Sequence, residues 1–314
     1  MKKILVTGAF GQIGTDLVPA LQAKYGKDNV VALGHSKVPA DFQGVSELCS
    51  IDQIDRLREL IKKYEIDTVF HLVSILSAKG EQNPNLTWET NMGGLKNILD
   101  LAVEFKLKVF WPSTIAAFGS TTPKDNTPQR TIMEPTTMYG VTKVAGELLV
   151  QYYHLKFGTD VRSVRYPGII SWKAEPGGGT SDYAVAIFYE AVKGNNYNCF
   201  VREDTMMPMM YMDDCIHATI GIMEADPEKL TVRTSYNLAG LSFTVRELAD
   251  EIKKYYPNFK VEYNPDFRQA IADSWPNSMD DSTATKDWNW HHEFDLSKMS
   301  KAMIDGLKAK FNIT

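Results

Sequence analysis

The chain has 314 residues, of which 44% are hydrophobic and 23% charged, and its formal net charge is −5. This composition is ordinary for a globular protein with a well-buried core, and the acidic balance argues against nucleic acid as a partner. The three cysteines form neither a close pair nor a metal-binding spacing, which indicates a reducing compartment and no metal. No apolar run approaches the length of a membrane span, and an apolar strand begins at residue 4 with no signal peptide before it. We therefore expect a cytoplasmic protein with no membrane partner.

The chain opens with an apolar strand, a glycine turn and a helix. Residues 4–7 run into Gly8, Gly11 and Gly14, and the apolar residues that follow have helical spacing. Glycines allow a tight turn and the close approach of a pyrophosphate, to which the helix N-terminus offers free N–H groups. The same pattern also suits a tight turn that binds nothing, so both interpretations stay open at this point.

The second predicted strand, residues 30–33, ends without a carboxylate. Many dinucleotide-binding folds place an acidic residue here to hold the adenosine ribose, whereas this chain has Gly34, His35, Ser36 and Lys37. His35 and Ser36 can donate to the ribose. Lys37 can tolerate an extra phosphate, or it can simply belong to a solvated turn. This edge alone does not distinguish NAD from NADP.

Alternating strands and helices continue through the first half. A third strand ends at Glu47 and Leu48, where an adenine could lie, a polar loop is expected over residues 74–85, and a long helix begins at Asn91. Further strands are predicted at residues 69–73, 109–111, 161–166 and 235–238. The glycine-rich residues 177–180 and the methionine-rich residues 206–212 are expected to be mobile and close to a pocket.

This alternation predicts an α/β fold, a Rossmann-type doubly wound parallel sheet of about seven strands with a smaller C-terminal α/β region. We expect residues 1–170 to form the dinucleotide-binding domain, with a segment near 209–240 returning to it. Residues 171–314 are expected to be mainly substrate-binding.

Tyr139 and Lys143 are the residues that point most directly to chemistry. Residues four apart share one face of a helix, and an ammonium near a phenol favours the phenolate, which can act as a general base. Ser113 and Thr114 follow a predicted strand and could orient an alcohol. A tyrosine and a lysine on an exposed helix are more often plain surface residues. Together with the glycine turn, however, they favour hydride removal from an alcohol beside a nicotinamide.

The sequence resembles the extended short-chain dehydrogenase/reductase family over roughly its first 240 residues. The resembling motifs are Thr7-Gly8-x-x-Gly11-x-x-Gly14, Asn91, Ser113-Thr114, Tyr139-x-x-x-Lys143, Arg165-Tyr166-Pro167 and Tyr211-Met212-Asp213-Asp214. The resemblance implies Tyr139 as the base, Lys143 at the nicotinamide ribose and Thr114 as the hydroxyl partner, with Ser113 close by. The implied cofactor contacts are Gly8, Phe10, Gly11, Gln12, Ile13, His35, Ser36, Glu47, Leu48, Leu72, Lys143, Tyr166, Pro167 and Ile169.

Segments in the substrate half resemble one branch of that family, the short-chain L-threonine 3-dehydrogenases. The resembling segments are residues 74–81, 112–115, 178–183, 209–212 and 274–288. The likeness implies oxidation of the C3 hydroxyl of L-threonine to 2-amino-3-oxobutanoate with NAD as cofactor and no metal. The expected substrate contacts are Ser74, Ser77, Ser113, Tyr139 and Thr180.

Two other functions fit the same fold. A nucleotide-sugar epimerase or dehydratase usually carries an Asn after the sixth strand and an Arg before the Tyr-x-Asp-Asp segment, where this chain has residues 167–170 and Met207-Pro208. A non-catalytic dinucleotide sensor need not keep the pair of Tyr139 and Lys143.

The helices that begin at Asn91 and Tyr139 each carry an apolar stripe. In the resembled family such helices pack against their copies, which implies a homodimer. The alternative is that both stripes simply cover the sheet.

Overall fold

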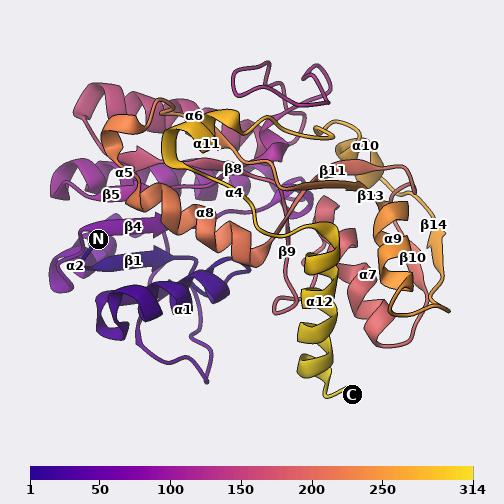
Figure 1. Ribbon diagram of the computed structural model, residues 1–314. Helices are drawn as coiled ribbons and strands as arrows, with labels where there is room; N and C mark the ends of the chain where they lie inside the picture. Colours follow the sequence, from indigo (N-terminus) through magenta and orange to yellow (C-terminus); the bar gives the residue numbers. More distant parts are fainter. Residues whose placement is uncertain (314) are drawn as a thin grey trace.

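A doubly wound parallel sheet forms the N-terminal half of the computed structural model, which describes residues 1–313 (Figure 1). Its strands are β1 (Ile4–Thr7), β2 (Val30–Gly34), β3 (Val45–Leu48), β4 (Thr68–His71), β5 (Lys108–Phe110) and β7 (Val161–Arg162). They are all parallel and lie in the order β3-β2-β1-β4-β5-β7. The order reverses between β1 and β4, which is where open sheets of this kind bind ligands. The predicted fold class is confirmed.

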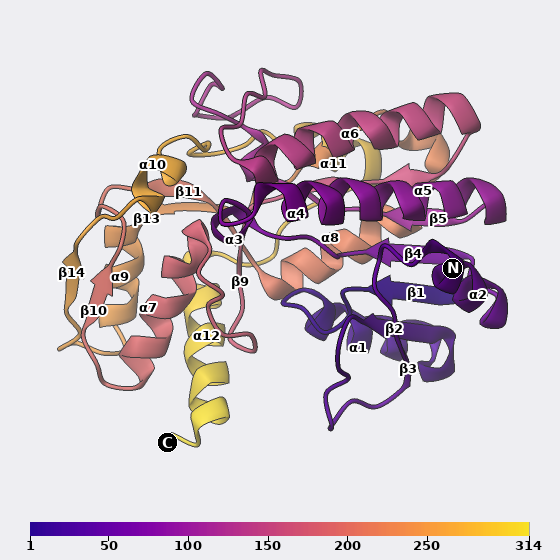
Figure 2. The same ribbon diagram turned by 180° about the vertical axis from the view of Figure 1, so that it is seen from behind.

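Helices cover both faces of this sheet because alternate strand residues point to opposite sides. Ile4 and Val6 of β1 pack in a core with α1 (Gly14–Tyr25) and α8 (Met212–Glu224), whereas Leu5 packs on the other face. The second face is covered by α2 (Ile54–Lys63), α5 (Gly94–Phe105) and α6 (Met138–Phe157). Figure 2 shows α5 and α6 side by side on this face.

A short second sheet continues the first beyond Pro112. It contains β6 (Ser113–Thr114), β8 (Val164–Tyr166) and β12 (Tyr236–Asn237), in the order β12-β8-β6. Proline has no N–H to donate to a ladder, so β5 ends before it and β6 begins after it. The main sheet therefore has six strands rather than about seven, and the strand predicted at residues 235–238 pairs with β8 in this extension.

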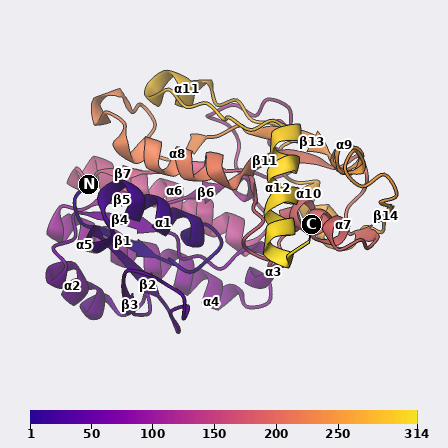
Figure 3. The ribbon, with the colours of Figure 1, turned by 60° about the horizontal axis from the view of Figure 1, so that its bottom comes forward.

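The C-terminal half lies at one end of the main sheet and has a core of its own (Figure 3). Its strands are β9 (Gly168–Ile170), β10 (Tyr197–Cys199), β11 (Met206–Tyr211), β13 (Leu241–Thr244) and β14 (Val261–Tyr263). Its helices are α7 (Tyr183–Val192), α9 (Val245–Lys253), α10 (Arg268–Ala272) and α12 (Leu296–Phe311). The methionine-rich segment is thus a strand and not a mobile loop, because Met207 and Met209 are fully buried in this core.

The chain returns to the first half near its end. The helix α11 (Ser282–Trp288) and the buried Trp290 join the core that holds Ile4 and Leu17. The indole nitrogen of Trp290 donates to Asp281 at 2.9 Å. This second return was not predicted from the sequence.

The segment predicted as a loop over residues 74–85 is partly helical. It contains α3 (Ser77–Gly80) and the start of α4 (Pro84–Trp88), which continues through a π-turn, η2 (Glu89–Gly93), into α5. Asn83 caps α4 by accepting a hydrogen bond from the backbone N–H of Leu86, and proline suits the first helical position. A capping residue followed by proline is the local signal for this helix.

The two apolar stripes have different surroundings. Leu95, Ile98 and Leu99 of α5 are buried against the sheet. On α6, by contrast, Leu148 is 57% exposed and Leu155 is 74% exposed. The alternative that both stripes cover the sheet therefore holds for α5 but is wrong for α6.

Across residues 1–313, no helix combines the length and apolar character needed to cross a membrane.

Candidate active site

The glycine turn between β1 and α1 forms a cradle that side chains would fill. Gly8 has a φ of +70°, which favours glycine, and a Cβ on Gly14 would lie 2.5 Å from the carbonyl oxygens of Gly8 and Ala9. Within the described chain, no side chain caps α1 at Ile13. The N–H groups of Thr15 and Asp16 bond to the carbonyl oxygens of Gly11 and Ile13, whereas those of residues 12–14 have no backbone acceptor among residues 1–313. These N–H groups at the start of α1 can bind an anion, so the turn fits the pyrophosphate of a dinucleotide.

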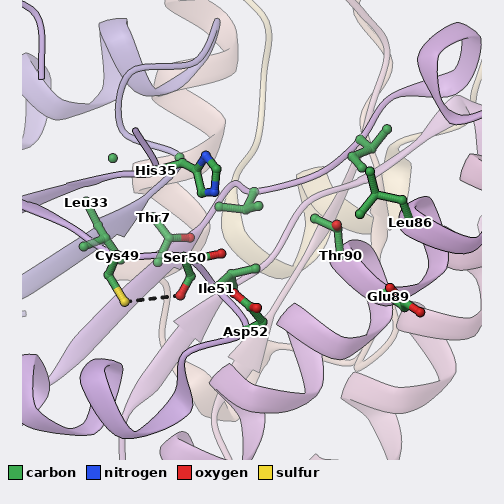
Figure 4. A pocket seen from close by; sticks show the side chains of 14 residues that line it. Thr7, Leu33, His35, Cys49, Ser50, Ile51, Asp52, Leu86, Glu89 and Thr90 are labelled. Atoms are coloured by element: carbon green, nitrogen blue, oxygen red, sulfur yellow. Dashed lines mark hydrogen bonds between the residues drawn. The ribbon is translucent and has the colours of Figure 1, made fainter. Parts of the chain in front are cut away.

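A cavity of about 450 Å³ opens on one side of this turn (Figure 4). Its lining residues are Thr7, Gly8, Leu33, Gly34, His35, Cys49, Ser50, Ile51, Asp52, Val73, Ile75, Leu86, Glu89 and Thr90. The acidic residues Asp52 and Glu89 belong to this lining, whereas Lys37 does not. A ribose phosphate placed here would meet like charge, so the cavity suits the free ribose of NAD better than NADP.

Three of the expected contacts at this edge lie outside the cavity. Glu47 accepts hydrogen bonds from Lys63 (2.7 Å) and Tyr64 (2.6 Å) and so faces α2. Leu48 is 45% exposed, and Ser36 is not part of the lining. Because β3 ends at Leu48, the residues just beyond the strand reach the edge of the sheet. At this edge the cavity is therefore lined by Ser50 and Ile51 and not by Glu47 and Leu48, the residues expected beside the adenine.

Phe10 explains why β2 ends in glycine. A Cβ on Gly34 would lie 2.8 Å from the ring of Phe10, which also packs edge-on against Phe42. An acidic side chain at position 34 would collide with this ring. Phe10 itself lines a separate groove beside α1 rather than the cavity at Gly34.

A smaller cleft of about 150 Å³ lies where β4, β6 and β8 end and where β9 and α6 begin. It brings together most of the remaining predicted residues, namely Gln12, Ile13, Leu72, Ser74, Ser77, Ser113, Thr114, Tyr139, Lys143, Tyr166, Pro167, Ile169 and Thr180. Gly11 lies in the glycine turn and lines neither the cavity nor the cleft. Asp182 and Trp275 also line it and were not predicted. Among the lining residues, Lys143 is the only lysine or arginine.

Tyr139 and Lys143 meet in this cleft. The side chain of Thr137 caps α6 by accepting from the N–H of Gly140, which fixes the turn that carries Tyr139. The Lys143 ammonium lies 5.5 Å from the centroid of the Tyr139 ring and donates to the carbonyl oxygen of Pro112 at 2.6 Å. Helical spacing and the break in the sheet at Pro112 thus place the amine beside the phenol.

Burial shifts the pKa of both groups. It raises the pKa of Tyr139 to about 12, although interaction with the Thr114 side chain acts in the opposite direction. It lowers the pKa of Lys143 to about 7, against the effect of the nearby Glu147 charge. In the free protein at neutral pH, Tyr139 is therefore a phenol and Lys143 is close to its midpoint.

The hydroxyl groups of the cleft differ in what they can offer a ligand. Ser113 Oγ donates to the buried Glu147 carboxylate at 2.6 Å, so toward the cleft it can only accept. Thr180 Oγ1 and Ser74 Oγ are buried without a hydrogen-bond partner in residues 1–313. Buried hydroxyls normally have hydrogen-bond partners. The two unpaired hydroxyls of Thr180 and Ser74 are therefore available to form hydrogen bonds with a ligand. The described residues contain no cluster of His, Cys, Asp and Glu that could hold a metal.

Comparisons with known proteins agree with this architecture. Residues 4–239 match the NAD dependent epimerase/dehydratase family. An uncharacterized epimerase/dehydratase of Staphylococcus saprophyticus is 50% identical, over 99% of this chain and 98% of the relative.

Two solved structures have nearly the same fold. An L-threonine dehydrogenase of Cupriavidus necator in its holo form is 48% identical, with a TM-score of 0.96 over 98% of this chain and 100% of that one. A monomeric L-threonine 3-dehydrogenase from a metagenome is 47% identical, with a TM-score of 0.95 over 98% and 99% of the two chains.

The family match and the glycine cradle agree on the cofactor and confirm the predictions of NAD and of an enzyme. The match with this family spans the main sheet, the glycine turn and every residue that lines the cleft except Trp275. The chain belongs to the NAD-dependent epimerase/dehydratase family.

Proposed function

We propose that this chain is an NAD-dependent L-threonine 3-dehydrogenase that oxidises the C3 hydroxyl of L-threonine to 2-amino-3-oxobutanoate. The observation that carries the proposal is the meeting of Tyr139, Lys143, Ser113 and Thr114 in one small cleft. The near full-length likeness to solved L-threonine dehydrogenases supports it.

The cleft offers what a small zwitterion requires. A carboxylate needs hydrogen-bond donors, and the unpartnered hydroxyls of Ser74 and Thr180 can supply them. An ammonium needs acceptors, which Ser113 and Asp182 provide. A sugar diphosphate would instead need several cations, and Lys143 alone does not meet that need.

The reaction requires removal of a proton from the C3 hydroxyl oxygen and of a hydride from C3 itself. The Tyr139 phenolate takes the hydroxyl proton while the C3–H bond breaks with its electron pair and C3–O becomes a carbonyl. Lys143 stabilises the phenolate, and the Thr114 hydroxyl positions the alcohol oxygen. When bound, the nicotinamide of NAD supplies the acceptor for the hydride.

Absorbance of reduced nicotinamide tests the reaction directly. The purified protein is mixed with L-threonine and either NAD or NADP, and with L-serine as a control alcohol. We expect a steady rise with L-threonine and NAD and a much slower one with NADP. No rise with either cofactor would exclude the dehydrogenase. A panel of nucleotide sugars would then test the epimerase function, and NADH binding without any turnover would favour a sensor.

We also propose a cytoplasmic homodimer that is joined through the exposed stripe of α6. The stripe contains Val141, Leu148, Tyr152 and Leu155, which are all exposed. This stripe is more apolar than the solvent-facing side of a helix normally is, which supports its burial against a second copy of the chain. The oligomeric state needs its own measurement, because one of the solved relatives is a monomer.

A further inference from the structure

A buried ion pair lies behind the cleft and has no role in the reaction described above. Glu147 is on α6, one helical turn after Lys143, and its side chain is fully buried. Arg165 on β8 binds it in a fork, with Nε donating to Oε1 at 2.9 Å and Nη2 to Oε2 at 2.8 Å. Two parallel charge-assisted hydrogen bonds fix the carboxylate in one orientation.

The remaining contacts hold the guanidinium in place. Nη1 of Arg165 donates to the carbonyl oxygen of Gln129 (2.9 Å) and to Asn237 Oδ1 (2.8 Å). Ser113 Oγ provides a third donor to Glu147. Neither charge can move away from Lys143 without breaking several buried hydrogen bonds, so both act on it from fixed positions.

The groups that face Lys143 come from three elements. Tyr139 and Glu147 lie one turn before and after it on α6, Arg165 stands behind Glu147 on β8, and His71 is on β4. His71 is neutral at physiological pH because burial lowers its pKa to about 3. Glu147 is therefore the negative charge that opposes the effect of burial on Lys143. Arg165 is the positive charge bound to Glu147, so by Coulomb's law its effect on Lys143 has the opposite sign.

We propose that Glu147 and Arg165 are positioning residues that set the protonation of Lys143, with Glu147 retaining the ammonium and Arg165 limiting that effect. The proposal rests on the NAD-dependent function proposed above and on the contact of Lys143 with the nicotinamide ribose that the family resemblance implies, and it does not require threonine as the substrate. Its consequence is that the two buried charges, which touch neither cofactor nor substrate, decide the pH range in which the cofactor binds.

Equilibrium binding of NADH, followed by nicotinamide fluorescence across a pH series, tests this without any turnover. NADH affinity should fall as Lys143 loses its proton, so each protein has a midpoint pH. Glu147→Gln leaves Lys143 beside an uncompensated Arg165, and we expect its midpoint about one pH unit lower than that of the wild type. Arg165→Gln leaves an uncompensated Glu147 and should move the midpoint the other way. The double variant restores a neutral pair and should return the midpoint close to the wild-type value.

Opposite shifts separate this role from a structural one. If the pair only held the fold together, both single variants would melt earlier and bind NADH more weakly at every pH, with unmoved midpoints, and the proposal would be overturned. Should Glu147→Gln fail to fold, the upward shift in Arg165→Gln and its reversal in the double variant still decide the question.

Lys143→Met identifies the titrating group. A wild-type midpoint that persists in this variant would remove the proposed contact of Lys143 and this inference with it. A midpoint that disappears in Lys143→Met but is unmoved by the other substitutions would overturn the inference alone.

Discussion

The hydroxyl of Thr7 and Nδ1 of His71 lie 2.8 Å apart, so a hydrogen bond joins β1 to β4 beneath the glycine turn. Both side chains are fully buried, and Nε2 of His71 has no partner among residues 1–313. Burial lowers the pKa of His71 to about 3. The folded protein therefore keeps this imidazole neutral at pH values where the unfolded chain takes up a proton.

The first prediction is that His71 makes the protein sensitive to acid. Between pH ~6.5 and the folded-state pKa, the unfolded chain binds a proton that the native state excludes. The free energy of unfolding therefore decreases by about 1.4 kcal/mol for each unit by which the pH is lowered. His71→Asn keeps a polar group opposite Thr7 but cannot titrate. The difference between the unfolding free energies of the wild type and the variant, measured by urea unfolding, should therefore decrease by about 1.4 kcal/mol when the pH is lowered from ~6 to ~5. A gap that stays constant would contradict the assignment.

The second prediction concerns the general base. Tyr139→Phe removes the phenol oxygen and should reduce kcat by about 10²–10⁴-fold, because proton transfer loses its acceptor. NADH affinity, measured by fluorescence, should change little. Tyr152→Phe alters an exposed tyrosine on the same helix and serves as the control, with near-wild-type kcat expected. Substantial turnover by the Tyr139 variant would remove this residue as the base.

The pH dependence of turnover follows from the paired pKa shifts. The reactive form has a Tyr139 phenolate and a Lys143 ammonium, and thus one proton fewer than the fully protonated pair. That proton is lost at the lower pKa of the two, which is about 7 for Lys143. We expect kcat/KM for L-threonine to rise about tenfold per pH unit below this value and then to level off. A kcat/KM that falls as the pH rises from acid to neutral would rule out this pair.

Gly14 and Gly93 provide a matched pair of glycine substitutions. A Cβ at Gly14 would lie 2.5 Å from two carbonyl oxygens, so Gly14→Ala should distort the cradle and weaken NADH binding by tenfold or more, roughly 1.4 kcal/mol. Around Gly93 nothing lies within 4 Å of the added carbon. Gly93→Ala should therefore leave binding unchanged and raise the melting temperature slightly. Equal effects at the two positions would show that the cradle does not hold the cofactor.

The proposed dimer can be tested by changing the exposed stripe. Sedimentation equilibrium should give a dimer for the wild type and a monomer for the double variant Leu148→Glu/Leu155→Glu, because charges would be buried in an apolar interface. Phe267→Glu places a charge on another exposed apolar residue, 68% exposed, and should not change the mass. A wild-type monomer would overturn the dimer without affecting the site.

Local patterns predicted the cleft better than they predicted the cavity beside it. Tyr139 and Lys143 meet because four residues make one helical turn, and the glycine turn follows directly from its own sequence. That Ser50 and Ile51 line this cavity, and Glu47 and Leu48 do not, depends on where an edge strand ends, which no local pattern determines.

Longer-range features also escaped prediction. The pair of Glu147 and Arg165 depends on how β8 passes beneath α6, so neither residue alone indicates it. The spacing of Glu147 four residues after Lys143 was a usable signal, since it places a third polar side chain on the same helical face.

Trp290 is buried in the same core as Ile4, although nearly the whole chain separates them. During synthesis, α11 and Trp290 leave the ribosome after the strands and helices whose core they complete. Until these residues emerge, the part of this core that Trp290 fills stays open to water. Shortening the chain before α11 would leave this gap in the core of the nucleotide-binding half permanently.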